Sequence, residues 1–160
     1  ALPLMEAFKT PPGVGHRSLE SGDRGVLMGL EEEVMSMLWA SSGKRYLKFC
    51  GSILDPGQDG VVFYGGYTKE KARLRGFFPM SFKEIYDCYA NQGRGFVYAA
   101  VESTNRSSRS LHERMGFKLV GETYFVTIFG LSVCYYKKWP HPTGRLHIFF
   151  KRPPRKLDWI

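Results

Sequence analysis

An arginine pair lies directly before a predicted helix start, in the segment from Thr68 to Pro79. Arg73, Arg75 and Gly76 occupy the last positions before that helix. The first N–H groups of a helix have no partner within it, and the helix dipole adds partial positive charge, so this junction favours an anion. Arginine supplies charge and paired donors that match a phosphate group. The predicted chemistry is phosphate binding; a solvated basic turn is the alternative.

A second polar group follows further along the chain. Asn105 and Ser108 are three residues apart, on one side of a predicted helix entrance. His112 is a candidate acid or base, because histidine exchanges a proton near neutral pH. Ordinary helix capping, with His112 as a half-exposed polar neighbour, is the alternative interpretation. Glu70 and Glu102, at strand ends, are further candidate bases, although such carboxylates are more often solvated or paired with arginine.

The elements that must position these residues are predicted from apolar periodicity. Alternation predicts strands, while large apolar residues at helical spacing after Phe78 predict a helix that has Pro79 in its first turn and ends near Gly93. A shorter helix runs from an Asn105 N-cap to Gly116. The predicted strands are 24–30, 34–40, 45–54, 61–68, 96–102, 117–129, 131–139 and 145–151, with a charged turn at 31–33.

Strands 61–68 and 96–102 are apolar on both faces, which is typical of central strands covered on each side. The helix between them predicts a parallel pair with a right-handed crossover, set in a mixed sheet. With 160 residues and 43% hydrophobic composition, the chain suits one domain over 1–160. Segment 1–24 is poorly defined, and 141–160 is interpreted as a C-terminal extension.

Charge and cysteine content narrow the partners and the compartment. The net charge of +8 favours anionic partners. Three cysteines without CxxC spacing argue against a disulfide framework and a zinc site, and predict a reducing, cytoplasmic location. No apolar run approaches the roughly 20 residues that span a bilayer. The chain begins at Ala1 rather than methionine, which leaves open whether an N-terminal piece is missing.

Together, the two polar segments resemble the GNAT superfamily of N-acetyltransferases. The acyl-CoA motif of that family, Arg or Gln, x, x, Gly, x, Gly or Ala, follows a central strand and aligns with Arg73 to Phe78. The resemblance covers roughly 25–140 and is most secure over 61–121. The later family pattern, Asn-x-x-Ser or Ala, Leu-Tyr, then Gly-Phe, aligns with Asn105, Ser108, Leu111, His112, Gly116 and Phe117.

The resemblance implies an α/β fold of the α+β kind, with a mixed, mostly antiparallel sheet, helices on both faces and a central parallel strand pair splayed to hold CoA. It also implies acetyl-CoA, or another acyl-CoA, as co-substrate. The pantetheine arm would bond the backbone near Tyr67 and Thr68, and the pyrophosphate would lie on the loop before the helix. The implied cofactor-binding residues are Tyr67, Thr68, Arg73, Leu74, Arg75, Gly76, Phe77, Phe78, Asn105 and Ser108.

The implied activity is N-acetyl transfer, or transfer of another acyl group, to an amine of a small molecule or protein. The amine would attack the thioester directly, without a covalent enzyme intermediate. His112 stands where the family usually has a tyrosine acid, and Glu70 is the candidate base; no metal is implied. Aromatic residues near the C-terminal hairpin make a homodimer a further expectation.

Three departures from the family pattern keep a second hypothesis open. Leu74 replaces a usual glycine, Phe78 replaces a small residue, and Pro79 removes one N–H group from the helix start. A non-catalytic GNAT-fold binding or regulatory module is therefore the alternative to an acyltransferase. Nucleic-acid binding through the basic surface is a third and weaker hypothesis, because the basic tail lacks interleaved aromatic residues.

Overall fold

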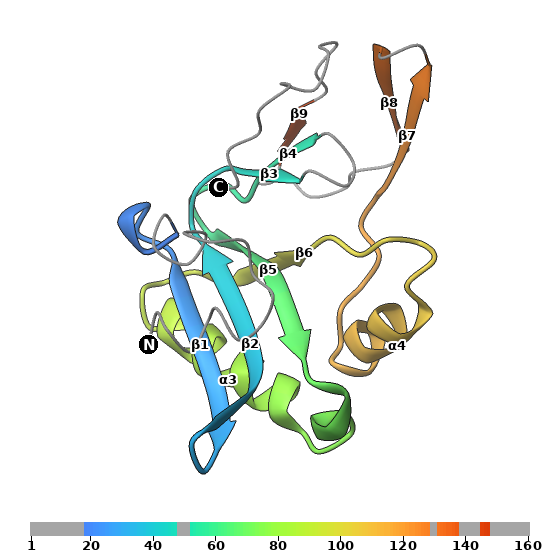
Figure 1. Ribbon diagram of the computed structural model, residues 1–160. Coiled ribbons are helices and arrows are strands. Elements are labelled where there is room, and N and C mark those ends of the chain that lie inside the picture. Colours follow the sequence, from blue (N-terminus) through green and yellow to red (C-terminus); the bar gives the residue numbers. More distant parts are fainter. Residues whose placement is uncertain (1–17, 48–51, 129–130, 138–144, 148–160) are drawn as a thin grey trace.

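A four-stranded sheet organises the computed structural model, which describes residues 18–47, 52–128, 131–137 and 145–147. Its order is β1 (Arg24–Leu30), β2 (Glu33–Ser41), β5 (Gly60–Thr68) and β6 (Phe96–Ala99). The first three strands are antiparallel neighbours, while β5 and β6 run parallel (Figure 1). The predicted mixed sheet with one parallel pair is therefore confirmed. Segment 1–17 and the basic tail lie outside the described residues.

The β1–β2 hairpin turns at the predicted acidic residues. Glu31 adopts a left-handed backbone with φ 56°, and β2 begins at Glu33. From Val34 to Ser41 every residue of β2 is buried, since neighbours cover both of its faces. This strand therefore forms the middle of the sheet and carries residues of two apolar clusters.

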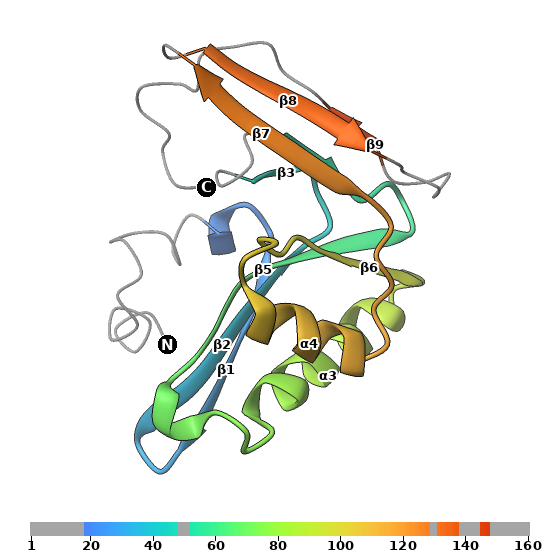
Figure 2. The same cartoon turned by 90° about the vertical axis from the view of Figure 1, so that its right-hand side faces the viewer.

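Helix α3 (Phe77–Ala90) supplies the crossover between the parallel strands. It lies along one face of the sheet, with α4 (Arg106–Arg114) beside it (Figure 2). Ile85 and Tyr89 of α3 pack with Leu38 and Phe63 in the main apolar cluster. The Tyr89 hydroxyl donates to the Ala40 carbonyl oxygen at 3.2 Å and fixes the helix to β2.

The predicted strand 45–54 is wrong as a single element. It consists of β3 (Arg45–Leu47) and β4 (Ser52–Asp55), which pair antiparallel with Leu47 opposite Ser52. Alternation of apolar and polar residues looks the same in one long strand and in two short consecutive strands, so it does not distinguish them. Together with β9 (Arg145–His147), they form a separate three-stranded sheet. The rest of the predicted last strand, 148–151, lies outside the described residues.

Two other predicted strands are longer than the observed ones. Strand 96–102 ends at Ala99, and strand 117–129 begins only at Glu122. After these strands, β7 (Glu122–Ile128) and β8 (Leu131–Lys137) form an antiparallel pair. This pair lies at the same end of the molecule as β9 (Figures 1 and 2). Within the described ranges, no helix is long and apolar enough to cross a membrane.

Candidate functional site

Strand β5 continues past the end of its parallel partner. The last β5–β6 pair joins Phe63 to Ala99, and β5 then runs on to Thr68 beside β2 (Figure 1). Gly60 to Phe63 are buried, whereas Gly65, Gly66 and Tyr67 are exposed. The expectation that strand 61–68 is covered on both sides is therefore wrong for its second half. The reason is that β6 reaches only the first four residues of β5.

A bulge interrupts β5 just beyond this point. Tyr64 pairs with Trp39 and Tyr67 with Met37, so Gly65 and Gly66 together oppose a single β2 residue. Gly65 takes a left-handed backbone, with φ 59°, a conformation that glycine adopts without a steric penalty. The sequence interpretation missed this bulge, although two adjacent glycines inside a strand are its usual signal.

The end of β5, where the pantetheine-binding residues are predicted, is held by β2. The buried Ser36 hydroxyl lies 3.1 Å from the Tyr67 carbonyl oxygen, to which it donates, and 3.0 Å from Thr68 Oγ1. Lys69 N–H donates to the Met35 carbonyl oxygen at 2.9 Å. The backbone at the end of β5 is therefore fixed although β6 does not accompany it.

The predicted phosphate loop leads from a short 3-10 turn, η1 (Glu70–Ala72), to α3. Gly76 is the N-cap of α3, with φ 82° and no side-chain cap, and the first bond of the helix runs from Met80 N–H to the Gly76 carbonyl oxygen at 3.0 Å. The N–H groups of Phe77 and Phe78 come before that bond and have no acceptor within the helix. The helix start therefore has backbone donors that no helical acceptor uses, at the position where the anion site is predicted.

Leu74 and Phe78, the two bulky departures from the family motif, have opposite environments. Leu74 is 98% exposed and has a left-handed backbone, with φ 63°. The Phe78 ring packs toward the sheet: a Cβ atom added to Gly66 would lie 2.8 Å from its Cε2 atom. Phe78 also packs against the main apolar cluster. Its bulk is thus directed inward rather than over the exposed Arg73–Gly76 loop.

Helix α4 begins as predicted and holds His112 in a defined orientation. Asn105 Oδ1 accepts from Ser108 N–H at 3.1 Å, which confirms the N-cap. The ring centroid of His112 lies 5.9 Å from that of Phe78 and 4.9 Å from that of Phe117. The structure thereby brings the two predicted motifs into contact.

A backbone contact selects the tautomer of His112. Its Nδ1 atom lies 2.8 Å from the Ser108 carbonyl oxygen and 3.4 Å from the Ser108 hydroxyl. A carbonyl oxygen only accepts, so Nδ1 carries the proton of the neutral ring, and Nε2 carries the lone pair. His112 therefore donates from Nε2 only as an imidazolium ion. This constraint comes from the helix backbone, which residue types alone did not reveal.

The predicted base Glu70 lies in solvent. Its side chain is 84% exposed and pairs with Arg73 at 3.4 Å, an i,i+3 contact. In the described ranges, no hydrogen bond or ion pair joins Glu70 to His112. Glu102 is also exposed, and its carbonyl oxygen accepts from Asn105 N–H. In the part of the chain that the structure describes, neither of these two carboxylates is bonded to His112.

Two lysines at the start of the loop are paired with β2. Glu33 accepts from Lys71 and, at 2.9 Å, from Lys69. The Lys71 contact is the main reason that the pKa of Glu33 lies below its usual value, and Lys69 adds to it. Within the described residues, Arg75 has no side-chain partner, so its charge faces solvent beside the helix start.

Comparison with solved structures identifies the fold. Aminoglycoside N-acetyltransferase AAC(6')-Iy in complex with CoA superposes with a TM-score of 0.65 at 16% identity, over 79% of this chain and 92% of that chain. The same enzyme has also been solved with the bisubstrate analogue CoA-S-monomethyl-acetylneamine. No protein-family model and no curated protein sequence matches the chain.

Two other neighbours have different descriptions. Ribosomal-protein-alanine N-acetyltransferase from Brucella melitensis biovar Abortus 2308 has a TM-score of 0.55 at 10% identity, over 79% of this chain and 90% of that chain. A transcriptional regulator from Bacillus halodurans C-125 has a TM-score of 0.55 at 17% identity, over 73% and 77%. The chain has the GNAT fold, and the predicted fold class is confirmed.

Proposed function

We propose that this GNAT-fold chain is an N-acyltransferase that moves an acetyl or other acyl group from CoA to an amine. One observation carries the proposal: β5 extends beyond Ala99, the last residue of β6, and leads through η1 and the Arg73–Gly76 loop to the N-terminus of α3, which has no side-chain cap. A strand edge and a helix start in succession offer backbone groups to an amide-bearing arm and then to a phosphate group. The neighbour solved with CoA supports the same choice of co-substrate.

Each part of an acyl-CoA has candidate contacts in this chain. The backbone near Tyr67 and Thr68 would bond the pantetheine arm, while the helix start at Gly76 would take the pyrophosphate. The remaining residues of the proposal are Arg73, Leu74, Arg75, Phe77 and Phe78 around the phosphate group, with Asn105 and Ser108 facing the arm. The ring of Phe78 does not extend over the exposed loop that would take the pyrophosphate, and it lies against Gly66 of the β5 extension.

Acyl-CoA would supply a thioester that an amine can attack directly. His112, in its imidazolium form, would donate a proton to the departing sulfur. Glu70 would take a proton from the amine through water, since its carboxylate is exposed. Within the described residues Asn105 Nδ2 has no partner, because the cap uses only Oδ1. The amide can therefore donate to the co-substrate without uncapping α4.

The acceptor is proposed to be an amine, in keeping with the acetylneamine analogue bound by a neighbour. Whether it belongs to a small molecule or a protein stays a prediction, as do the homodimer and the cytoplasmic location. Nucleic-acid binding remains the weaker alternative for the basic surface. A strong salt dependence of binding to DNA or RNA would support that alternative.

Calorimetry with acetyl-CoA tests the binding part of the proposal. The parent protein should bind, and Arg75→Ala should weaken binding about tenfold, the usual effect of losing a charged hydrogen bond. Arg114→Ala, at the exposed end of α4, removes the same charge and should leave the affinity unchanged. A folded parent that gives no heat with millimolar acetyl-CoA would refute the proposal.

A non-catalytic binding module is the second candidate. Leu74, with its left-handed backbone, and the exchange of a family tyrosine for His112 are the observations that favour it. The transcriptional regulator among the structural neighbours shows that the fold is not restricted to proteins described as acetyltransferases. Turnover of acetyl-CoA with any amine in a substrate screen would exclude this candidate, whereas binding without turnover would favour it.

A further inference from the structure

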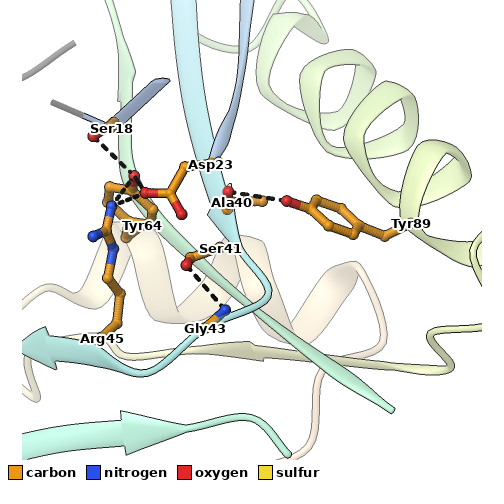
Figure 3. Close-up of polar contacts among 8 residues, drawn as sticks. All are labelled: Ser18, Asp23, Ala40, Ser41, Gly43, Arg45, Tyr64 and Tyr89. Atoms are coloured by element: carbon orange, nitrogen blue, oxygen red, sulfur yellow. Dashed lines mark hydrogen bonds and ion pairs between the residues drawn. The ribbon is translucent and has the colours of Figure 1, made fainter. Parts of the chain in front are cut away.

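A buried polar cluster lies on the face of the sheet opposite α3. It contains Ser18, Asp23, Arg45 and Tyr64, whereas Tyr89 reaches the sheet from the other side (Figure 3). The Tyr64 hydroxyl oxygen lies 2.7 Å from Asp23 Oδ2 and 3.1 Å from Ser18 Oγ. Arg45 Nη2 donates to both Asp23 and Tyr64. Burial raises the pKa of Tyr64, so its hydroxyl keeps the proton that it donates.

The cluster holds β5 at the position where β5 leaves β6. Phe63 forms the last pair with β6, Tyr64 follows it, and the bulge begins at Gly65. The three partners of Tyr64 come from residue 18, from the residue before β1, and from the first residue of β3. Two segments, the turn 18–23 and the start of β3, therefore fix one side chain at the start of the β5 extension.

The ring of Tyr64 is fixed as well as its hydroxyl. The Arg45 guanidinium lies 4.1 Å from the centroid of the Tyr64 ring, and the Trp39 ring stacks with it at 6.4 Å. Trp39 also covers the bulge, because a Cβ atom added to Gly65 would lie 3.3 Å from its Cδ1 atom. Any movement of Tyr64 would thus displace the ring that lies against Gly65.

The chemistry of the cluster suits positioning better than stabilisation. Asp23 is 6% exposed and Arg45 is 4% exposed, and a buried ion pair contributes little net stability compared with apolar packing. Arg45 Nε and Trp39 Nε1 are buried and have no hydrogen-bond partner within the described ranges. Unpaired buried donors reduce stability further. The cluster therefore serves to hold Tyr64, and with it β5, in one defined position.

We propose that Asp23, Arg45 and Tyr64 are positioning residues that hold the β5 extension, 65–68, in the place where it binds acyl-CoA. The inference rests on the proposed function. These residues would fix the backbone of the binding site at Gly65, and they would not contact the reacting atoms. The buried side chains of Asp23 and Arg45 and the half-buried side chain of Tyr64 lie on the face of the sheet away from α3, whereas the phosphate loop leads into α3.

Tyr64→Phe tests the proposal, since it removes the hydroxyl and keeps the ring. Amide hydrogen exchange of 65–68 should become at least about fivefold faster, because the variant loses the contacts of the hydroxyl with Ser18, Asp23 and Arg45. Exchange in α3 should not change. Acetyl-CoA should bind about threefold or more weakly, and kcat/KM should fall through KM more than through kcat. Ser18→Ala removes only the 3.1 Å contact and replaces Tyr64→Phe if that variant does not fold.

Tyr89→Phe is the matched control, because it also removes a tyrosine hydroxyl, one that lies on the opposite face of the sheet and donates to the Ala40 carbonyl oxygen. It should leave both the exchange of 65–68 and the affinity for acetyl-CoA unchanged. Equal effects of the two substitutions, or no effect of Tyr64→Phe on exchange, would overturn the positioning role. A parent that binds acetyl-CoA and a Tyr64→Phe variant that binds it equally well would also overturn it, and the proposed function would stand. A parent that does not bind acetyl-CoA would refute the proposed function, while the exchange measurement still decides whether the cluster positions β5.

Discussion

The ring of Phe78 meets the imidazole of His112 edge to face, with 5.9 Å between their centroids. Because Phe78 also lies against Gly66, one side chain joins β5, the first turn of α3 and the last turn of α4. We expect Phe78→Ala to reduce the free energy of unfolding by about 2 kcal/mol, less than for a fully buried phenylalanine. Urea unfolding measures this change.

The same variant tests whether the ring of Phe78 obstructs the binding of acetyl-CoA. If the ring packs inward, Phe78→Ala will not increase the affinity for acetyl-CoA, although alanine belongs to the family pattern. Met80→Ala is the control in the same helix, since its side chain is 54% exposed and its loss should change stability little. Tighter binding by Phe78→Ala would show that the ring obstructs the phosphate loop.

Leu74→Gly should stabilise the protein. The left-handed backbone costs a residue with a Cβ atom about 1–2 kcal/mol, and glycine recovers it at a smaller entropic cost. Leu74 is 98% exposed, so little packing is lost. We expect the free energy of unfolding to rise by about 0.5–1 kcal/mol. Leu119→Gly, at a 76% exposed leucine whose φ is not positive, should not stabilise.

The two functions assigned to Asn105 can be separated. Asn105→Ala removes the cap of α4 and should cost about 1 kcal/mol of stability. Asn105→Ser keeps a capping oxygen for Ser108 N–H and removes the amide group without adding a charge. It should leave stability nearly unchanged and weaken acetyl-CoA binding less than Arg75→Ala does. Unchanged calorimetric affinity in Asn105→Ser would exclude the amide from the site.

His112→Tyr tests whether His112 supplies the proton donor. In the parent, Nδ1 lies against the Ser108 carbonyl oxygen, so Nε2 is the ring nitrogen left to act on the co-substrate. His112→Tyr restores the family residue with a hydroxyl donor and should keep turnover of acetyl-CoA measurable. His112→Phe should bind acetyl-CoA but turn over slowly at every pH.

Glu33 should contribute stability only above acid pH. Its pKa is lowered in the folded protein by Lys71 first and Lys69 second. A carboxylate with a depressed folded-state pKa stabilises the fold above its unfolded pKa, and that contribution disappears as the pH falls through the folded value. Glu33→Gln should thus be less stable than the parent near pH 7 and equal to it in acid, where the parent's carboxyl group is protonated in both the folded and the unfolded state. Urea unfolding near pH 7 and in acid tests this.

Local signals explain how much of the fold was predictable. Helix α3 was predictable from the spacing of its apolar residues. The Asn105 cap was predictable because asparagine is a preferred residue at the N-cap of a helix. The hairpin of β3 and β4 was missed because alternation carries no information on where the chain reverses. The length of β6 was overestimated because pairing with β5, rather than apolarity, ends that strand.

The site was predictable where a motif includes the helix start, and not where geometry depends on tertiary contacts. Asn105 has the predicted capping role, and Gly76 lies directly before the start of α3, as predicted. The inward direction of Phe78 depends on Gly66, which is distant in sequence and opens the space for its ring. The cluster around Tyr64 joins segments that share no local pattern, so the sequence interpretation did not identify it.

The bulge at Gly65 and Gly66 has a consequence for solubility. A strand that extends beyond its neighbour presents an edge on which a strand of another molecule can pair, and such edges promote aggregation. The φ of 59° at Gly65 interrupts the regular spacing of donors and acceptors along this edge. A foreign strand therefore cannot add in continuous register, and the irregularity that shapes the binding site also protects the protein from self-association through β5.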